Sequence, residues 1–169
     1  MKISGKTVKY GDNINTDVII PSKYLTSLDP SDWAKHAMEG IDTDFPRKAR
    51  EGVIIVAGRN FGCGSSREQA PQALKYAGVK CVIAESFARI FFRNAINIGL
   101  PVMEAPGITV KVNEGDMLSV YLDEGRIVNE SSGESIFAIR LPDFILEIIR
   151  DGGLIEHLIK VIGGGRSEV

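Results

Sequence analysis

The chain has 169 residues, of which 44% are hydrophobic and 25% are charged, a composition typical of a globular domain with its own core. A formal net charge of −2 gives no indication of a general nucleic-acid or membrane surface. No apolar run approaches the roughly 20 residues that span a bilayer, and the first residues lack a signal-peptide pattern. We therefore expect a single domain over residues 1–169, located in the cytoplasm.

The two cysteines, Cys63 and Cys81, form neither a CxxC pair nor a disulfide framework, which favours a compartment that keeps both thiols reduced. Two thiolates are too few for an iron–sulfur cluster, which usually takes three or four. His36 and His157 lack the spacing of zinc ligands. No metal or cofactor is therefore expected on this chain itself.

The N-terminal part predicts short elements. Residues 1–27 read as strands and turns, with a break at Pro21. Asp29 and the proline after it are typical of a helix start, so a short helix is predicted over residues 29–38. Residues 39–52 are polar and charged and predict a loop.

Residues 53–103 predict the centre of the fold. The apolar run 53–57 predicts a strand, and a helix follows with Ala70, Ala73, Leu74 and Ala77 on one face. A second strand over 79–84, a helix over 87–98 capped by Ser86, and an extended segment from residue 100 come next. Strand–helix–strand–helix–strand at this spacing favours parallel pairing with right-handed crossovers.

The remainder changes character. Alternating apolar residues at 110–112, 118–122 and 136–139, separated by turn residues, predict a β-meander. Helices are predicted from Pro142 to the glycines at 152–153 and over 154–162, and a frayed tail over 163–169. The sequence thus predicts an α/β fold in one domain, with a mixed sheet, a parallel β-α-β-α core and a β-meander.

The most informative stretch is the glycine-rich turn between the first core strand and its helix. It reads Asn60-Phe61-Gly62-Cys63-Gly64-Ser65-Ser66-Arg67-Glu68. Gly62 and Gly64 permit unusual backbone conformations and the close approach of a ligand. Unpaired amides at a helix start attract carboxylates and phosphates, and an arginine can hold a carboxylate with two hydrogen bonds. This pattern indicates an anion pocket that also contains two serine hydroxyls.

Two structural alternatives stay open. Ser65 and Glu68 also fit a capping box, in which each side chain bonds the other residue's amide. Further along, Arg89, Arg93 and Asn97 are spaced by four and share one helix face. That face is either a solvated or interface surface, or a second basic contribution beside the Ser65–Arg67 pocket.

Three segments in this order resemble the swivelling domain of the aconitase superfamily. They are Asn15-Thr16-Asp17-Val18-Ile19 with Tyr24-Leu25 after it, the stretch 60–68, and Glu85–Ala95 followed by Gly99-Leu100-Pro101. The resemblance covers nearly the whole chain, and it is strongest to the separate small subunits of 3-isopropylmalate dehydratase and homoaconitase.

The resemblance implies a three-layer β/β/α swivelling fold and a partner. In this family a separate large catalytic subunit carries a [4Fe-4S] cluster on three cysteines and leaves one iron open. The active site then lies between the subunits, and the substrate is a hydroxy di- or tricarboxylic acid that is dehydrated and rehydrated. Activity is therefore expected only with the large subunit.

The same resemblance assigns roles by position. Ser65 matches the family's serine base, and Ser66 and Arg67 match substrate-binding positions beside Gly64. A serine is a poor base unless its alkoxide is stabilised, and helix amides and an arginine can do that. Asp17 matches the family's acidic active-site residue; its alternative reading is an Asx-turn or a helix cap.

The substrate is read from the loop that begins at Tyr24. In the family this loop lies over the variable substituent, with an arginine after the Tyr-Leu pair for a distal carboxylate and apolar residues for an isopropyl group. This chain has Thr26-Ser27-Leu28, which matches neither pattern. Because a buried distal carboxylate would lack a partner, the sequence favours isopropylmalate, with homoaconitate or another alkyl-malate as the alternative. A non-catalytic anion-binding module is the competing class.

Overall fold

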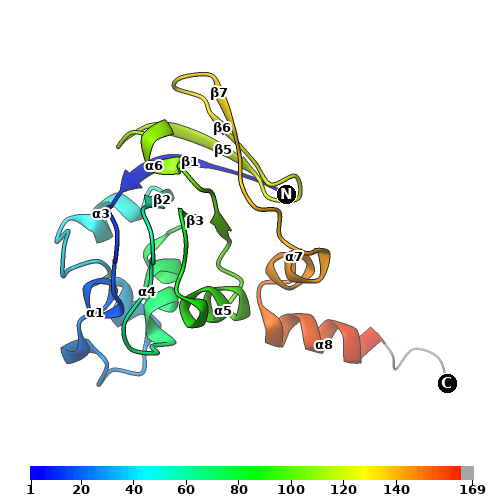
Figure 1. Cartoon of the computed structure of the whole chain (residues 1–169). Helices are drawn as coiled ribbons and strands as arrows, with labels where there is room; N and C mark the ends of the chain where they lie inside the picture. The colour runs from blue at the N-terminus through cyan, green and yellow to red at the C-terminus, as the bar shows by residue number, and fades with distance from the viewer. Residues whose placement is uncertain (165–169) are drawn as a thin grey trace.

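A seven-stranded mixed sheet forms the centre of the structure, a computed structural model that describes residues 1–164. Its strand order is β4-β3-β2-β1-β5-β6-β7. The strands are β1 (Lys2–Lys9), β2 (Val53–Ala57), β3 (Cys81–Ala84), β4 (Val102–Glu104), β5 (Met117–Tyr121), β6 (Arg126–Asn129) and β7 (Glu134–Phe137). In Figure 1, β5, β6 and β7 extend across the top of the molecule, above the parallel strands.

The parallel half of the sheet confirms the predicted β-α-β-α core. Strands β1 to β4 lie side by side and run in one direction, with Val8 opposite Ile55 and Ile55 opposite Val82. Every residue of β2 and β3 is buried, which explains why both read as continuous apolar runs.

The antiparallel half confirms the meander but corrects its strands. Strand β5 pairs with β1, β6 with β5, and β7 with β6. The strand expected at 110–112 is wrong, because residues Ile108–Lys111 form helix α6. Ile108 and Val112 are buried at a spacing of four, whereas Val110 is 87% exposed, so the burial follows a helical period. Strand β6 was not predicted.

Short helices surround the sheet. They are α1 (Thr16–Ile19), the 3₁₀ turn η1 (Ser22–Tyr24), α2 (Pro30–Ala34), α3 (Phe45–Ala49), α4 (Gln69–Ala77), α5 (Arg89–Asn97), α7 (Asp143–Arg150) and α8 (Leu154–Gly164). The predicted apolar face of α4 is confirmed, since Ala70, Ala73, Leu74 and Ala77 are all buried.

Two predictions before β2 are wrong. The loop expected over 39–52 contains α3, whose Phe45 and Ala49 are fully buried. Its proline lies in the first turn, where a missing N–H costs nothing. The helix expected over 29–38 already ends at Ala34, and Met38 adopts a positive φ of 60° while its amide bonds to the carbonyl of Ile19.

The C-terminal prediction is partly wrong as well. Helix α7 begins after Pro142, close to the expected position, but α8 reaches Gly164 and so takes up the first two residues of the expected tail. Residues 165–169 lie outside the described part of the chain. Within residues 1–164, no helix has the length and apolarity that a membrane crossing requires.

Candidate active site

The site is assembled where the parallel strands β1, β2 and β3 end, because the carboxyl ends of parallel strands share one edge of the sheet. The loop after β2 lies between the loops that follow β1 and β3. Isolated parallel β-bridges join it to both, from Cys63 to Asn15 after β1 and from Phe61 to Phe87 after β3. The Thr16 amide donates to the Cys63 carbonyl at 2.8 Å, and the Ala88 amide donates to the Phe61 carbonyl at 2.9 Å.

Two glycines are required in the loop after β2. Gly62 has φ +79°, and a Cβ at this position would lie 2.2 Å from the ring of Phe91. Gly64 has φ +96° and is exposed. Beneath them the buried rings of Phe61 and Phe91 pack edge to face with centroids 5.2 Å apart. The exposed turn thus lies on a layer of buried aromatic rings.

The two serines of the turn face solvent, and their amides are available. Ser65 and Ser66 are exposed. In residues 1–164 we find no acceptor for the backbone amides of residues 64–68, so five consecutive N–H groups are unpaired. Oriented amides of this kind form an anion-binding surface. The Thr16 hydroxyl donates to the Ser65 carbonyl at 3.0 Å and fixes that end of the turn.

The capping box is wrong. Helix α4 begins at Gln69, four residues after Ser65, and its N-cap Glu68 has helical backbone angles of −62° and −27° and makes no side-chain cap bond. Ser65 therefore does not cap the helix. Ser86 likewise does not cap α5, which starts at Arg89; its hydroxyl accepts from the Asn60 amide at 2.9 Å and joins two of the site loops.

Arg67 and Asp17, fifty positions apart in the sequence, meet in space. Arg67 Nη1 donates to Asp17 Oδ1 at 2.6 Å and to the Ile20 carbonyl at 3.0 Å. The Arg67 side chain is 14% exposed and that of Asp17 is 65% exposed. Both bonds use one nitrogen, so Nε and Nη2 of Arg67 have no partner among the described residues and can still hold a carboxylate.

The segment that carries Asp17 is fixed by its own cap. The Asn15 side chain accepts from the Val18 amide at 2.9 Å and starts α1. The cap is therefore Asn15, and the alternative of Asp17 as a helix cap is wrong. Thr16 is a contact that the sequence reading missed, since nothing local marks its bond to residue 65.

The predicted substrate loop is held at two points. The Tyr24 hydroxyl donates to Glu39 Oε1 at 2.7 Å, and the Ser27 hydroxyl donates to Asp32 Oδ2 at 2.8 Å. Between and beyond these anchors, Thr26 is exposed and Leu28 is 91% exposed. The contact of these four residues with a substrate stays a prediction.

The basic face of α5 points elsewhere. Arg89, Arg93 and Asn97 are exposed and line a groove of about 510 Å³ against the α7 residues Phe144, Ile145 and Ile148. None of Ser65, Ser66 and Arg67 lines this groove. The geometry agrees with a solvated or interface face.

Neither cysteine is placed to bind a cluster. Cys63 is half-buried in the turn, and burial raises the pKa of the fully buried Cys81 thiol to about 12. In the described part of the chain, no three side chains of His, Cys, Asp or Glu are grouped to hold a metal ion. The residues present do not fit a [4Fe-4S] cluster.

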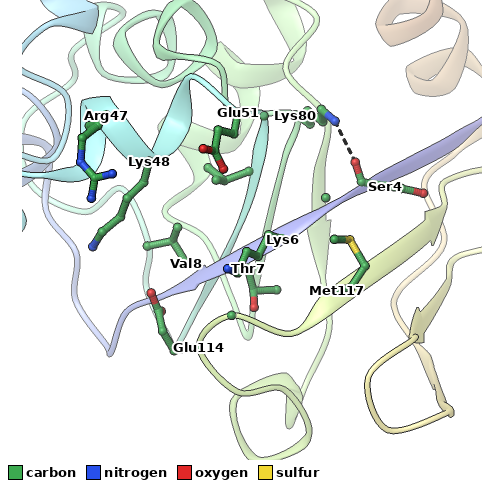
Figure 2. Close-up of a pocket in the computed structure, with 14 residues that line it drawn as sticks. Ser4, Lys6, Thr7, Val8, Arg47, Lys48, Glu51, Lys80, Glu114 and Met117 are labelled. Carbon is green, nitrogen blue, oxygen red and sulfur yellow. Dashed lines mark hydrogen bonds between the residues drawn. The ribbon is translucent and has the colours of Figure 1, made fainter.

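A larger cavity lies away from the turn. It has a volume of about 560 Å³ between β1 and α3, and Figure 2 shows Lys6, Lys48, Glu51 and Glu114 around it. Three of the four cations that line it are bonded to other groups: Lys48 pairs with Asp42, Arg47 with Asp44, and Lys80 donates to the Ser4 carbonyl. No predicted site residue lines it, so we locate the site at the exposed turn.

Comparison with known proteins identifies the family of the chain. The family model for the aconitase C-terminal domain matches residues 9–106, which include all three site loops. The chain belongs to this family.

Relatives of similar length extend the match over the chain. The 3-isopropylmalate dehydratase small subunit of Halothermothrix orenii is 56% identical over 97% of this chain and 98% of its own. That of Pyrobaculum calidifontis is 58% identical over 94% and 98%. The isopropylmalate/citramalate isomerase small subunit of Methanocaldococcus jannaschii is 54% identical over 94% of both chains.

A solved structure confirms the predicted swivelling fold. The crystal structure of 3-isopropylmalate dehydratase from Methanocaldococcus jannaschii matches with a TM-score of 0.91 and 47% identity, over 99% of this chain and 100% of the other. The two chains therefore share one fold over almost their whole length.

Proposed function

We propose that this chain is the small subunit of a two-subunit hydro-lyase that interconverts 2-isopropylmalate and 3-isopropylmalate in leucine biosynthesis. The observation that carries the proposal is the turn 64–68, where two exposed serines and Arg67 lie together with backbone amides that find no acceptor in the described part of the chain. Relatives with 53–58% identity to this chain are named 3-isopropylmalate dehydratase small subunit. Homoaconitase, the alternative from the sequence, is not the name of any relative reported above.

Ser65 is the proposed base. The reaction removes a weakly acidic C–H proton beside a carboxylate, and the Ser65 Oγ would take that proton as an alkoxide and return it on rehydration. A serine alkoxide is unfavourable at neutral pH unless positioned donors stabilise it, and the amides of the turn are the donors nearest in sequence. The Thr16 hydroxyl at the Ser65 carbonyl limits movement of the turn.

Arg67 is the proposed carboxylate ligand, with Asp17 as the residue that orients it. Asp17 and the Ile20 carbonyl occupy Nη1, which leaves the outer edge of the guanidinium for the substrate. Two parallel hydrogen bonds to a carboxylate would orient the acid over Ser65. Ser66 and Gly64 would contribute their amides, and Ser66 its hydroxyl.

The partner is proposed to be the large catalytic subunit. The names of the relatives contain the words small subunit, which imply such a partner. We assign the [4Fe-4S] cluster to that subunit, since the residues described for this chain do not fit one. The exposed turn would then meet a substrate bound on the partner, in a cytoplasm that keeps both thiols reduced.

A second substrate has specific support. One relative with 54% identity is named an isopropylmalate/citramalate isomerase small subunit. Thr26, Ser27 and Leu28 present no cation that would pair a distal carboxylate, and Leu28 is an exposed apolar group. Alkyl-malates with a methyl or isopropyl substituent are therefore the proposed substrate class.

The proposal is tested by reconstitution. Each subunit is purified alone and assayed with 2-isopropylmalate under anaerobic conditions, and the two are then mixed. Turnover is expected only in the mixture, and it should persist when Cys63→Ser or Cys81→Ser replaces the native chain. Turnover by this chain alone, or none in the mixture with an active large subunit, would overturn the proposal.

A further inference from the structure

A polar and aromatic cluster lies directly behind the substrate loop. The rings of Tyr24 and His36 are stacked with centroids 3.6 Å apart and planes 7° from parallel. Glu39 accepts from both of them: Tyr24 Oη lies 2.7 Å from Oε1, and His36 Nδ1 lies 2.6 Å from Oε2. Lys23 completes the cluster, with its Nζ 3.5 Å from Glu39 and 4.9 Å from the centre of the Tyr24 ring.

These contacts determine which atoms of Glu39, His36 and Tyr24 carry a hydrogen. The pKa of Glu39 lies below its usual value, chiefly because the Tyr24 hydroxyl donates to its carboxylate. His36 and Lys23 lower this pKa further. Glu39 is therefore a carboxylate at neutral pH, a pure acceptor, and His36 Nδ1 must carry a hydrogen. The single hydrogen of the Tyr24 hydroxyl is consequently donated to Glu39, which ties the start of the substrate loop to residue 39.

The segment that carries Glu39 is also joined to the catalytic side of the site. The Met38 amide donates to the Ile19 carbonyl at 2.8 Å, and the Gly40 amide donates to the Val18 carbonyl at 3.3 Å. A Cβ on Gly40 would lie 2.8 Å from the Val18 Cα, so the two backbones are in close contact. Residues 38–40 thus bridge α1, which carries Asp17, and the substrate loop.

The loop has a second anchor on the same segment. Trp33, which is buried, donates its indole N–H to the Ser27 carbonyl at 3.1 Å, and Asp32 accepts from the Ser27 hydroxyl. With Tyr24 and Ser27 both fixed, only Thr26 and Leu28 project outward. The loop is therefore attached at both ends to residues 32–39.

We propose that Glu39, with His36, is a positioning residue that sets the distance of the substrate loop 24–28 from Asp17 and Arg67 and thereby selects the substrate's alkyl substituent. The inference rests on the proposed function, and neither Glu39 nor His36 needs to touch the substrate. Positioning errors in a binding loop act most on the substrate that makes the most contact with it.

The test compares two substrates in the reconstituted enzyme. Glu39→Gln keeps the shape but places an amide against His36, and Tyr24→Phe keeps the ring stack but removes one hydrogen bond. Each is expected to lower kcat/KM for 2-isopropylmalate about tenfold and for citramalate less than threefold, which converts to about 1.4 kcal/mol for the former. Glu39→Gln disturbs the contact with His36, and Tyr24→Phe removes the hydrogen bond from Tyr24. Because both contacts hold the same loop through residue 39, the losses in the double variant should be less than additive.

The matched control is Asp44→Asn, which breaks the exposed Arg47–Asp44 pair in the next helix. It should leave the ratio of the two kcat/KM values unchanged. Equal losses for both substrates in Glu39→Gln and Tyr24→Phe would leave the ratio of the two kcat/KM values unchanged and would overturn the positioning role.

A structural readout separates this inference from the proposed function. Amide hydrogen exchange in residues 24–28 should quicken in Glu39→Gln and in Tyr24→Phe, but not in Asp44→Asn. If the native enzyme converts neither substrate, the proposed function fails while quickened exchange still supports the anchor. Unchanged exchange in a folded Glu39→Gln chain would overturn the inference in either case.

Discussion

The most direct perturbation of the proposed mechanism is Ser65→Ala. Ser65 is exposed, its hydroxyl has no hydrogen-bond partner among the described residues, and it does not cap α4. The bond that fixes the turn goes to the Ser65 carbonyl, which alanine keeps. We therefore expect the free energy of unfolding to change by no more than about 0.5 kcal/mol.

The effect on the reaction should be far larger. Removing a positioned proton-transfer group costs about 10² to 10⁴ in rate, which corresponds to about 3 to 5 kcal/mol in activation free energy at 1.36 kcal/mol per tenfold. The assay is turnover of 2-isopropylmalate by the reconstituted enzyme, with urea unfolding of the small subunit measured in parallel. The two energies differ about sixfold or more, so a catalytic and a structural role give separate results.

A second exposed serine provides the control. Ser31 lies at the start of α2, also faces solvent, and is outside the site loops. Ser31→Ala should change neither turnover nor stability. Near-normal turnover in Ser65→Ala would refute the base assignment, and a large loss of stability would mean that Ser65 supports the turn instead.

Three further outcomes follow from the same structure. Arg67→Lys should lower kcat/KM about 10- to 100-fold, through both KM and kcat, because a lysine keeps the charge but loses the two-point contact with a carboxylate; native kinetics would place Arg67 outside the site. Thr26→Arg should raise the kcat/KM of homoaconitate relative to that of 2-isopropylmalate, since a new cation could pair with the distal carboxylate. A constant ratio would show that the loop does not contact the variable substituent of the substrate. Because burial raises the pKa of Cys81 to about 12 from 9.0, only the unfolded chain loses this proton above pH 9, so the free energy of unfolding should fall between about pH 9 and 12. Urea titrations of Cys81→Ala should show a smaller fall, and an equal fall would assign it to other groups.

Much of the fold could be predicted from the sequence where one residue pattern had one physical cause. The runs at 53–57 and 79–84 are apolar throughout because β2 and β3 are buried on both faces. The alanines and the leucine of α4 recur at helical spacing, and this spacing predicted the buried face of the helix just as directly. Where the sequence failed, short segments carried mixed signals: residues 108–112 alternate like a strand but are buried at helical spacing, and the burial of Phe45 depends on contacts distant in sequence.

The candidate site shows the same division. The glycines of the turn and Arg67 could be named from local pattern, because unusual backbone angles and anion binding both require particular residue types. The contact between Arg67 and Asp17 spans fifty positions, and that between Thr16 and Ser65 spans forty-nine. Only the family resemblance placed Asp17 in the site, and nothing placed Thr16, Glu39 or His36 there, since threonine, glutamate and histidine carry no local mark of such partners.

The arrangement of the site explains why a separate subunit can carry it. Arg67 is fixed on one nitrogen by Asp17 and Ile20, and the turn is fixed by Thr16, so the geometry exists before any ligand arrives. Yet the serines face solvent, and the amides of residues 64–68 have no acceptor within residues 1–164. In water these donors are hydrated and contribute little to catalysis, whereas the same donors in a dry site act strongly on a developing charge. A partner that covers the turn would therefore complete this site by excluding water from groups that are already in place.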